Sequence, residues 1–442
     1  MGKTLLAFLS LIIPNVVYSA PISFRWCVLS AAEKNKCTDF MMYVNETARN
    51  KSLDVDVGCV EENSVDDCVA KIKSEEADLM TLKGADMYKA GKTGNLVPIV
   101  SEQYGLSKVR YYAVAAVKRA NRDVNITTLK GKKSCHTGTR PRNADWNIPI
   151  GFLLSSKIIP EVACGNMNHD LISAGKFFNQ SCVPGAGAAG FNASGDIPSN
   201  LCVLCLGTGA DKCSADEDKN EYAGHEGAFK CMVDGKGDVA FFKHGTVEKA
   251  IKKGNYGNQT DYEYLCRDGS RKEIGEHATC YTGVNPAHAV VTRKGNTKIA
   301  AIITILTDMS EMYGVNQTNP SQFQLFNSTK YNGEDLLFKD STTTLVAIAT
   351  EKQTYQGYLG NDYVKDIEAL TECDFLTTTQ PPTTSISTQP PSTSISTNLV
   401  PYITLILLTA LLVMGSCKVR ECRARRHSVM PSRLAFARMH FW

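Results

Sequence analysis

The sequence has almost no excess charge of either sign and no convincing catalytic motif. Its 48 lysines and arginines against 45 aspartates and glutamates leave a formal net charge of +3 over 442 residues. So small an excess gives no electrostatic reason to expect a nucleic-acid partner. The only local suggestion of a nucleophile beside a base is Cys135 next to His136. Neighbouring side chains on a strand point to opposite faces, so we do not expect an enzyme.

Sixteen cysteines and the start of the chain indicate an oxidising compartment. Residues 1–20 have a positive charge at Lys3, an apolar core over Leu5–Ile13 and a small-residue exit, the pattern of a signal peptide. In such a compartment cysteines pair as disulfides. Secretion also agrees with eight Asn-x-Ser/Thr sequons, at Asn45, Asn50, Asn125, Asn179, Asn192, Asn258, Asn316 and Asn327.

A second apolar run, Leu399–Cys417, is long enough as a helix to cross about 30 Å of hydrocarbon. The basic tail 418–442 follows at once, which favours an extracellular N-terminal bulk and a cytoplasmic tail. A glycolipid-anchor signal would end in its hydrophobic segment, so we prefer a single transmembrane helix. The sequence therefore predicts a single-pass type I protein of the plasma membrane.

Residues 377–398 hold a duplicated nonapeptide, QPPTTSIST followed by QPPSTSIST. Serine, threonine and proline with almost no apolar content cannot build a core, so we interpret this segment as a stalk. The folded ectodomain then covers residues 24–376. Within it, apolar runs typical of strands (24–29, 53–60, 79–82, 111–117, 239–243 and 289–292) alternate with helical patterns (38–48, 64–75, 176–178, 227–234 and 297–313). This alternation predicts an α/β fold with parallel or mixed sheets, and the length favours two sheets.

Residues 131–151, GKKSCHTGTRPRNADWNIPIG, read as the end of a strand, a turn and a helix that begins near 143–147 and continues over Ile148–Ile159. A helix start presents unpaired N–H groups and a partial positive charge. With a threonine hydroxyl and a guanidinium beside it, such a start can hold an anion. An ordinary capped surface helix has the same local features, so both interpretations stay open.

Eight stretches, all in order, make residues 24–373 resemble a single lobe of the transferrin family. They are RWC (25–27), ADLMTL (77–82), YYAVAAVK (111–118), GKKSCHTG (131–138), WNIPIG (146–151), GAFKC (227–231), GDVAFFKHGT (237–246) and DLLFKDS (335–341). The resemblance implies a two-domain clamshell, hinged as in periplasmic binding proteins, with 24–110 and 287–373 as subdomain one and 111–286 as subdomain two. Ligand is then expected in the cleft between the two subdomains.

The resemblance also implies seven disulfides among the fourteen extracellular cysteines. The expected pairs are Cys27–Cys68, Cys37–Cys59, Cys135–Cys231, Cys182–Cys205, Cys202–Cys213, Cys266–Cys280 and Cys164–Cys373. Spacing alone does not choose among the possible pairings.

In this family ferric iron is held by one aspartate, two tyrosines, one histidine and a carbonate. Tyr111 matches the first tyrosine and His288 the histidine, whereas Lys83 stands at the aspartate position and His225 at the second tyrosine. Asp86, one helical turn after Lys83, is a weak candidate replacement. With two anionic ligands lost, we expect a much reduced iron(III) affinity. The set Tyr111, His225 and His288 suits zinc, copper or ferrous ions better.

The anion half of the site is better preserved. Thr137 and Arg142 match the family's anion-binding threonine and arginine, and Ala144 matches a backbone donor. The turn is one residue longer than expected, so Arg140 is an alternative to Arg142. Asp145 replaces a glycine donor, and its carboxylate could repel an anion.

Lys243 and Lys339 match a lysine pair that faces across the closed cleft, holds it while sharing a proton, and opens it when both are charged at endosomal pH. Two solvated surface lysines are the alternative. The first functional hypothesis is a cell-surface protein that binds a metal ion with carbonate or bicarbonate. The second is a metal-independent module for an anion, small ligand or protein. A cell-surface receptor is a further possible partner under either hypothesis.

Overall fold

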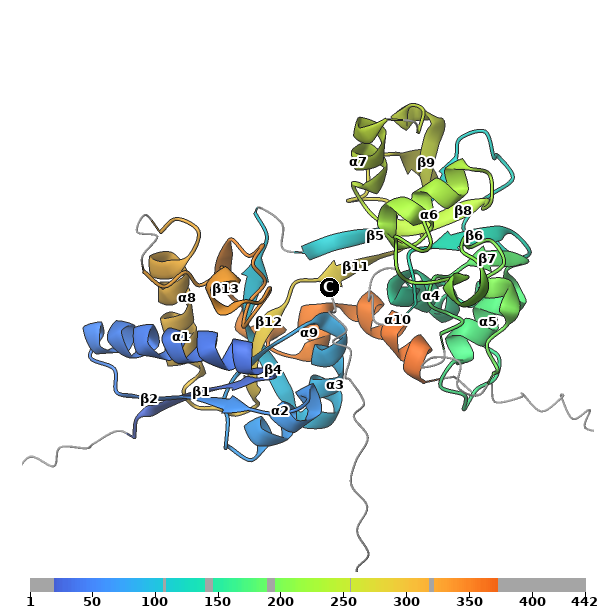
Figure 1. Cartoon of the computed structure of the whole chain (residues 1–442). Coiled ribbons are helices and arrows are strands. Elements are labelled where there is room, and N and C mark those ends of the chain that lie inside the picture. The colour runs from blue at the N-terminus through green and yellow to red at the C-terminus, as the bar shows by residue number, and fades with distance from the viewer. Residues whose placement is uncertain are drawn as a thin grey trace, which may run out of the picture. The chain divides into compact units, whose positions relative to one another are not determined.

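The computed structural model describes residues 20–105, 109–139, 146–188, 195–254, 256–317 and 322–372 (Figure 1). Several predicted features lie outside these ranges: most of the signal peptide, the anion-site residues Arg142, Ala144 and Asp145, the stalk, the transmembrane segment 399–417 and the tail 418–442. Within the described residues, no helix combines the length and the apolar character needed to span a bilayer.

The described strands are β1 (Ile22–Val28), β2 (Val55–Glu61), β3 (Met80–Leu82), β4 (Leu96–Gln103), β5 (Val109–Lys118), β6 (Lys133–His136), β7 (Gln180–Cys182), β8 (Val239–Lys243), β9 (Tyr262–Leu265), β10 (Arg271–Glu273), β11 (Gly283–Pro286), β12 (Ala289–Arg293) and β13 (Thr344–Ala347). The described α-helices are α1 (Ala31–Asn50), α2 (Val65–Lys73), α3 (Gly84–Gly94), α4 (Ile148–Ser155), α5 (His169–Phe177), α6 (Gly224–Val233), α7 (Thr246–Lys253), α8 (Ile299–Tyr313), α9 (Tyr355–Leu359) and α10 (Asn361–Thr371). Short 3-10 helices lie at Ser199–Leu201, Gly209–Asp211, Gln259–Asp261, Thr329–Tyr331 and Thr350–Lys352.

One sheet is antiparallel, with the order β13-β4-β12-β3, and β1 pairs in parallel with β2. The two ladders are joined by a single bridge between Trp26 and Leu79. The described residues therefore form three sheets, whereas two were predicted. A single bridge does not merge the β1–β2 ladder with the sheet that contains β3.

The second large sheet has seven strands, in the order β10-β9-β5-β8-β6-β7 with β11 also paired to β5. Strand β6 runs parallel to β7 and β8, whereas β5 runs antiparallel to β8, β9 and β11. The mixed α/β class predicted from the alternating pattern is confirmed.

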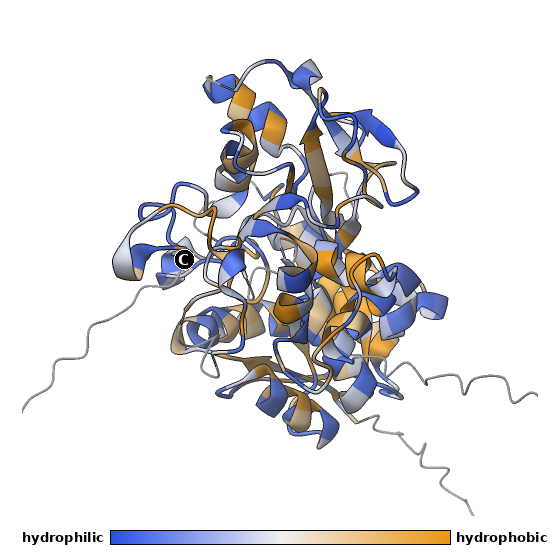
Figure 2. Cartoon of the chain, turned by 90° about the vertical axis from the view of Figure 1, so that its right-hand side faces the viewer, coloured by the Kyte–Doolittle hydropathy of each residue, from blue (hydrophilic) through white to orange (hydrophobic). Residues whose placement is uncertain are grey.

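The chain passes between the two large sheets twice, from β4 to β5 and from β11 to β12. Helix α10 contacts hydrophobic clusters on both sides. Its Ile367 belongs to the hydrophobic cluster that contains Leu82, whereas Ala369 and Leu370 belong to the cluster that contains Trp146. Many apolar residues of these clusters lie on strands and helices, and Figure 2 shows hydrophobic stretches of the ribbon in orange. The clamshell with its two subdomains stays a prediction.

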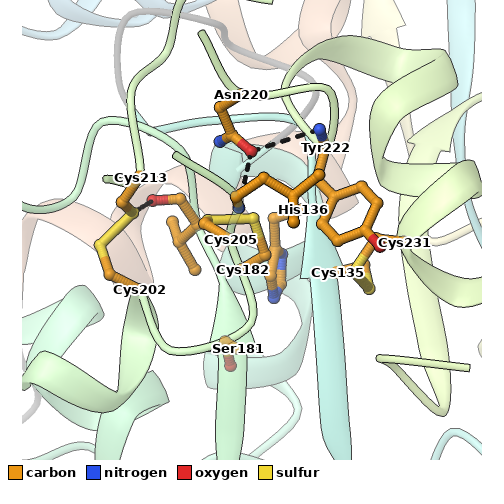
Figure 3. The surroundings of a disulfide bond; sticks show 12 residues. Cys135, His136, Ser181, Cys182, Cys202, Cys205, Cys213, Asn220, Tyr222 and Cys231 are labelled. Carbon is orange, nitrogen blue, oxygen red and sulfur yellow. Dashed lines mark hydrogen bonds between the residues drawn. A yellow bond between two sulfur atoms is a disulfide. The ribbon is translucent and has the colours of Figure 1, made fainter. Parts of the chain in front are cut away.

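Six of the seven expected disulfides are confirmed: Cys27–Cys68, Cys37–Cys59, Cys135–Cys231, Cys182–Cys205, Cys202–Cys213 and Cys266–Cys280. The seventh requires Cys373, which lies outside the described residues. Figure 3 shows three of them close together around Asn220, whose Oδ1 accepts hydrogen bonds from the backbone N–H groups of Leu206 and Tyr222.

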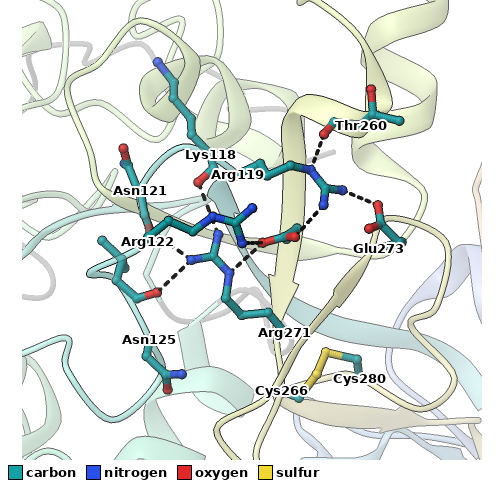
Figure 4. Close-up of polar contacts among 12 residues, drawn as sticks. Lys118, Arg119, Asn121, Arg122, Asn125, Thr260, Cys266, Arg271, Glu273 and Cys280 are labelled. Atoms are coloured by element: carbon teal, nitrogen blue, oxygen red, sulfur yellow. Dashed lines mark hydrogen bonds and ion pairs between the residues drawn. A yellow bond between two sulfur atoms is a disulfide. The ribbon is translucent and has the colours of Figure 1, made fainter.

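A buried carboxylate, Glu263 on β9, ties the end of β5 to β10. Figure 4 shows its arginine partners Arg119, Arg122 and Arg271. Its oxygens lie 2.6 Å from Arg119, 2.7 Å from Arg271 and 3.5 Å from Arg122. Because buried carboxylates are costly unless paired, this cluster orients the outer strands of the sheet.

Candidate functional site

Lys83 and His288 are neighbours at the end of one ladder. Strand β12 pairs antiparallel with β3, with Ala289 opposite Leu82, so the next residues on each chain, His288 and Lys83, lie side by side. The backbone of His288 is also held, because its carbonyl accepts a hydrogen bond from the N–H of Glu102 over 2.9 Å. Two of the four predicted ligand positions therefore come together here.

Lys83 sits at the N-cap of α3, where a positive charge opposes the helix dipole. Its Nζ lies 3.7 Å from Oδ2 of Asp86 in the first turn of the same helix. Burial raises the pKa of the Asp86 carboxyl, and the Lys83 charge opposes that rise. The place expected for an aspartate ligand thus holds a lysine–aspartate pair.

The other two ligand positions, Tyr111 on β5 and His225 on α6, also come together. Their ring centroids are 6.4 Å apart and the rings are nearly perpendicular. The backbone N–H of Lys243 donates to Nδ1 of His225 over 3.3 Å. A neutral imidazole that accepts at one nitrogen carries its proton on the other. His225 must therefore give up this hydrogen bond before either nitrogen can bind a metal.

Thr137 follows β6 and is 1% exposed. Its hydroxyl is buried and has no hydrogen-bond partner among the described residues, which is rare for a buried polar group. Its carbonyl accepts a hydrogen bond from Gly224 N–H over 2.9 Å, at the start of the helix that carries His225. The predicted anion contact and the predicted metal contact are thus linked through one backbone bond. Arg140, Arg142, Ala144 and Asp145 lie outside the described residues.

The two lysines of the predicted pH-sensitive pair have separate neighbours. Lys243, at the exposed end of β8, has its Nζ 6.0 Å from the ring centroid of Tyr111. The Lys339 ammonium group pairs with Asp335, and the backbone N–H of Lys339 donates to the Glu102 carboxylate. Their role as a pair stays a prediction.

Sequence reasoning missed Glu102, a buried carboxylate on β4. One of its oxygens, Oε2, accepts from the hydroxyls of Thr342 (2.5 Å) and Tyr104 (3.1 Å) and from Lys339 N–H (3.2 Å). Burial raises the pKa of Glu102 to about 7, and these hydrogen bonds, which favour the charged carboxylate, oppose that rise. The sequence could have indicated this buried carboxylate, because Glu102 lies at the end of the apolar run LVPIVSEQ.

Three residues are placed in structural roles. Cys135 is in a disulfide, and His136 is fully buried, which lowers its pKa to about 3. The Tyr222 hydroxyl donates to Asp234 over 2.9 Å.

In the described part of the chain, no group of three or more histidine, cysteine, aspartate or glutamate side chains is arranged to hold a metal ion.

The family profile described as Transferrin matches residues 24–372. Over 359 residues the chain is 40% identical to human melanotransferrin, covering 79% of this chain and 45% of that protein. Over 365 residues it is 38% identical to bovine serotransferrin, covering 82% of this chain and 47% of the relative. The chain therefore spans about half the length of the curated relatives it matches.

Proposed function

The chain belongs to the transferrin family, and from that premise we propose that it binds a metal ion together with a small anion. Membership in this family implies binding of iron or of another metal ion. The proposed metal contacts are Tyr111, His225 and His288, and the proposed anion contact is Thr137, with Arg142, Ala144 and Asp145 beside it.

The observation that carries the proposal is the buried Thr137 hydroxyl, which has no hydrogen-bond partner among the residues that the structure describes. An unpaired buried hydroxyl costs free energy unless a ligand supplies its partner. The hydrogen bond from the Gly224 N–H to the Thr137 carbonyl brings the backbone of residue 137 next to the helix start that bears His225, and the His225 ring lies near the Tyr111 ring. An anion at Thr137 would therefore lie close to two candidate metal ligands.

The donor set favours a metal other than ferric iron. A trivalent ion prefers anionic oxygen ligands, and Tyr111 is the one anionic donor that remains at the four family positions. Two imidazoles and one phenolate suit zinc, copper or ferrous ions. We propose that iron(III) with carbonate or bicarbonate still binds, at reduced affinity.

The test titrates the purified full chain, in bicarbonate buffer, with ferric nitrilotriacetate, zinc and copper. We expect binding of at least one metal, with weak or no tyrosinate-to-iron absorption. Tyr111→Phe should abolish metal binding. Tyr112→Phe changes the neighbouring residue, which is outside the predicted ligand set, and should leave metal binding intact. If no metal binds, or both variants bind alike, the proposal fails.

A second candidate is metal-independent binding of an anion, small ligand or protein. Lys83, whose position lies next to His288 on the paired strands, favours it because its ammonium can take the place of the metal charge when it turns away from Asp86, 3.7 Å distant. Combining Lys83→Asp with His225→Tyr should then create ferric binding that the native chain lacks. Tight ferric binding by the native chain would contradict this alternative.

We further propose that the protein is a glycosylated single-pass type I protein of the plasma membrane, with the lobe outside the cell on its stalk. The support is the order of signal peptide, sequons, stalk, apolar segment and basic tail in the sequence. Surface biotinylation and glycosidase digestion of the expressed full chain test this topology. Labelling of the tail at the outer surface would overturn it.

A further inference from the structure

The segment 118–133 holds a strong local excess of positive charge. Its sequence, KRANRDVNITTLKGKK, has six lysines and arginines and one aspartate, which is a net charge of +5. The whole chain has a formal net charge of only +3, so the residues outside this segment are together net negative. A charge excess confined to one segment indicates a partner of the opposite sign.

The fold places these cations at one edge of the seven-stranded sheet. Strand β5 ends at Lys118 and β6 begins at Lys133. Because β8 runs antiparallel to β5 and parallel to β6, the end of β5 and the start of β6 meet at the edge where β8 begins. Lys236 lies three residues before β8. Tyr111 is seven residues before Lys118 on β5, which at about 3.3 Å per residue is about 23 Å away, so this edge is separate from the proposed metal site.

Contacts within the chain connect the loops of this edge. The Lys132 ammonium group pairs with Asp123, so the turn that bears Arg122 lies beside the start of β6. The backbone N–H of Lys133 donates to the Asp238 carboxylate over 2.8 Å, which holds the turn before β8 at the same place. These loops therefore form one continuous surface.

The end of β5 belongs to the same surface. The Lys118 ammonium group donates to the carbonyl of Val233 over 2.8 Å, in the loop before β8. A hollow of about 500 Å³ lies between these segments. Its wall includes three cationic residues and one anionic residue: Lys118, Arg119, Arg122 and Asp261.

Most of these cations have no internal partner of opposite charge. In the described part of the chain, no carboxylate lies within 4.0 Å of four ammonium groups at this edge: Lys118, Lys130, Lys133 and Lys236. The Arg122 side chain is 67% exposed and lies 3.5 Å from Glu263. That carboxylate already has shorter contacts with two other arginines (Figure 4). These five charges are therefore available to an external anion.

The carboxylates that border the same surface are already engaged. Asp123 and Asp238 make the contacts described above. Asp234 pairs with Lys230 over 2.8 Å and accepts from the Tyr222 hydroxyl over 2.9 Å. Because internal partners offset their charge, these carboxylates repel an approaching anion less than free ones would.

We propose that the basic edge, defined as Lys118, Arg122, Lys130, Lys133 and Lys236, binds a sulfated polysaccharide. Sulfate groups repeat along such a chain, and each one needs only a cationic donor, which an ammonium or guanidinium group supplies. The hollow at the end of β5 has room for one sulfated sugar unit.

Two other classes of polyanion fit this surface less well. A single-stranded nucleic acid binds through stacking of its bases on aromatic side chains, and the basic edge contains none. An anionic membrane is flat, and a glycan at the exposed sequon Asn179, whose backbone N–H donates to the Lys132 carbonyl, would hold it away. Nucleic acid and membrane are therefore included in the test as alternatives.

The test measures binding to the purified full chain, in detergent and without metal, by isothermal titration calorimetry at several NaCl concentrations. N-glycans are first trimmed with endoglycosidase H, because a glycan at Asn179 would border the basic edge. The probes are a heparin hexasaccharide, its desulfated counterpart, duplex DNA of equal charge and phosphatidylserine vesicles. We expect heparin to bind at least tenfold more tightly than each other probe, with an affinity that falls as salt rises. Any other probe that binds as tightly as heparin would overturn the proposal.

Removal of charge from the basic edge locates the binding. The variant combines three changes at exposed positions: Arg122→Gln, Lys130→Gln and Lys236→Gln. It should weaken heparin binding about ten- to hundredfold and reduce the salt dependence of that binding.

A matched variant removes one arginine and two lysines at exposed positions elsewhere in the lobe: Arg49→Gln, Lys294→Gln and Lys352→Gln. Its heparin affinity should equal that of the wild type. If the two triple variants bind heparin alike, the charge of the basic edge is not responsible and the inference is wrong.

The basic tail needs a control of its own, because it is present in the full chain. A third variant combines Arg420→Gln, Arg423→Gln and Arg425→Gln and should keep its heparin affinity. A loss as large as that of the basic-edge variant would assign the binding to the tail and contradict the inference.

Because no metal is present, this result is independent of the titration that tests the metal proposal. The basic-edge variant should bind metal like the wild type, and Tyr111→Phe should bind heparin like the wild type. Failure of one proposal is therefore distinguishable from failure of the other.

Discussion

At the scale of single residues, the candidate site holds several groups whose surroundings differ from their usual ones. Within the described part of the chain, Thr137 has a buried hydroxyl without a partner, Glu102 is a buried carboxylate with one oxygen bonded, and Lys83 lies at a helix start that disfavours its charge. Each costs folding free energy in the absence of a ligand or a proton. Such costs are common where a protein is arranged for binding.

The first residue-scale prediction concerns Glu102→Gln. A carboxyl whose folded-state pKa is raised from 4.5 to about 7 favours its protonated form on folding. Its stability contribution is therefore fully present below about pH 4.5 and is lost as pH rises through about 7. The loss amounts to roughly 3 kcal/mol. Urea unfolding of the full chain between pH 5 and 8 should show this decline in the wild type and not in the variant.

Glu311→Gln, at an exposed position on α8, is the control for that series and should keep the wild-type pH slope. A slope in Glu102→Gln equal to the wild-type slope would show that another group causes the dependence.

A second residue-scale prediction separates stability from binding at Thr137. Thr137→Val removes a buried hydroxyl that lacks a partner among the described residues, so the free energy of unfolding should rise by about 1–3 kcal/mol. Bicarbonate-dependent metal uptake should fall at least tenfold in the same protein. Denaturant unfolding and metal titration measure the two effects. Thr342→Val is the matched control, since its hydroxyl is bonded to Glu102 and its loss should destabilise the fold.

At the scale of elements, the ends of helices were harder to predict than their existence. The apolar run predicted a helix over Ile148–Ile159, but α4 ends at Ser155. Lys157 adopts a left-handed conformation, and Pro160 disfavours helical backbone at the residue before it, Ile159. Helix α5 begins at His169, seven residues before the predicted 176–178, because its polar first turn has no apolar periodicity. Local hydrophobicity does not record these backbone preferences.

The element-scale prediction concerns the contact of α4 with α10. A Cβ added at Gly151 would lie 2.4 Å from the backbone carbonyl oxygen of Asp366, which cannot rotate away inside a helix. Gly151→Ala should therefore lower the free energy of unfolding by about 1–3 kcal/mol. Thermal and denaturant unfolding of the full chain measure it.

Gly94→Ala in α3 is its control, because the one close contact of the added Cβ, at 2.6 Å, is with the side-chain Cγ1 of Val69 and not with backbone. The gain in helix propensity, about 1 kcal/mol, should offset much of that contact. If Gly151→Ala is as stable as Gly94→Ala, α4 and α10 are less tightly packed than described.

At the scale of the whole molecule, the α/β class followed from the alternation of patterns, and six disulfide pairs followed from the family resemblance. The partners of Lys83 and His225 could not be predicted in the same way. Lys83 pairs with the candidate ligand Asp86, and His225 accepts a hydrogen bond from Lys243, eighteen residues away. Contacts between residues distant in sequence depend on the packing of whole elements, which no local pattern contains.

The last prediction compares two of these disulfides as restraints on the unfolded chain. Cys135–Cys231 joins residues 96 apart in the sequence, and Cys202–Cys213 joins residues 11 apart. In the chain-entropy description a longer closed loop restricts the unfolded state more, which predicts a difference of about 2 kcal/mol between the two bonds. Guanidinium unfolding of the oxidised full chain should thus show a larger loss for Cys135→Ala with Cys231→Ala than for Cys202→Ala with Cys213→Ala. Equal losses, or a larger loss for the short loop, would mean that native packing around Asn220 and Tyr222, rather than chain entropy, determines the contribution of each disulfide.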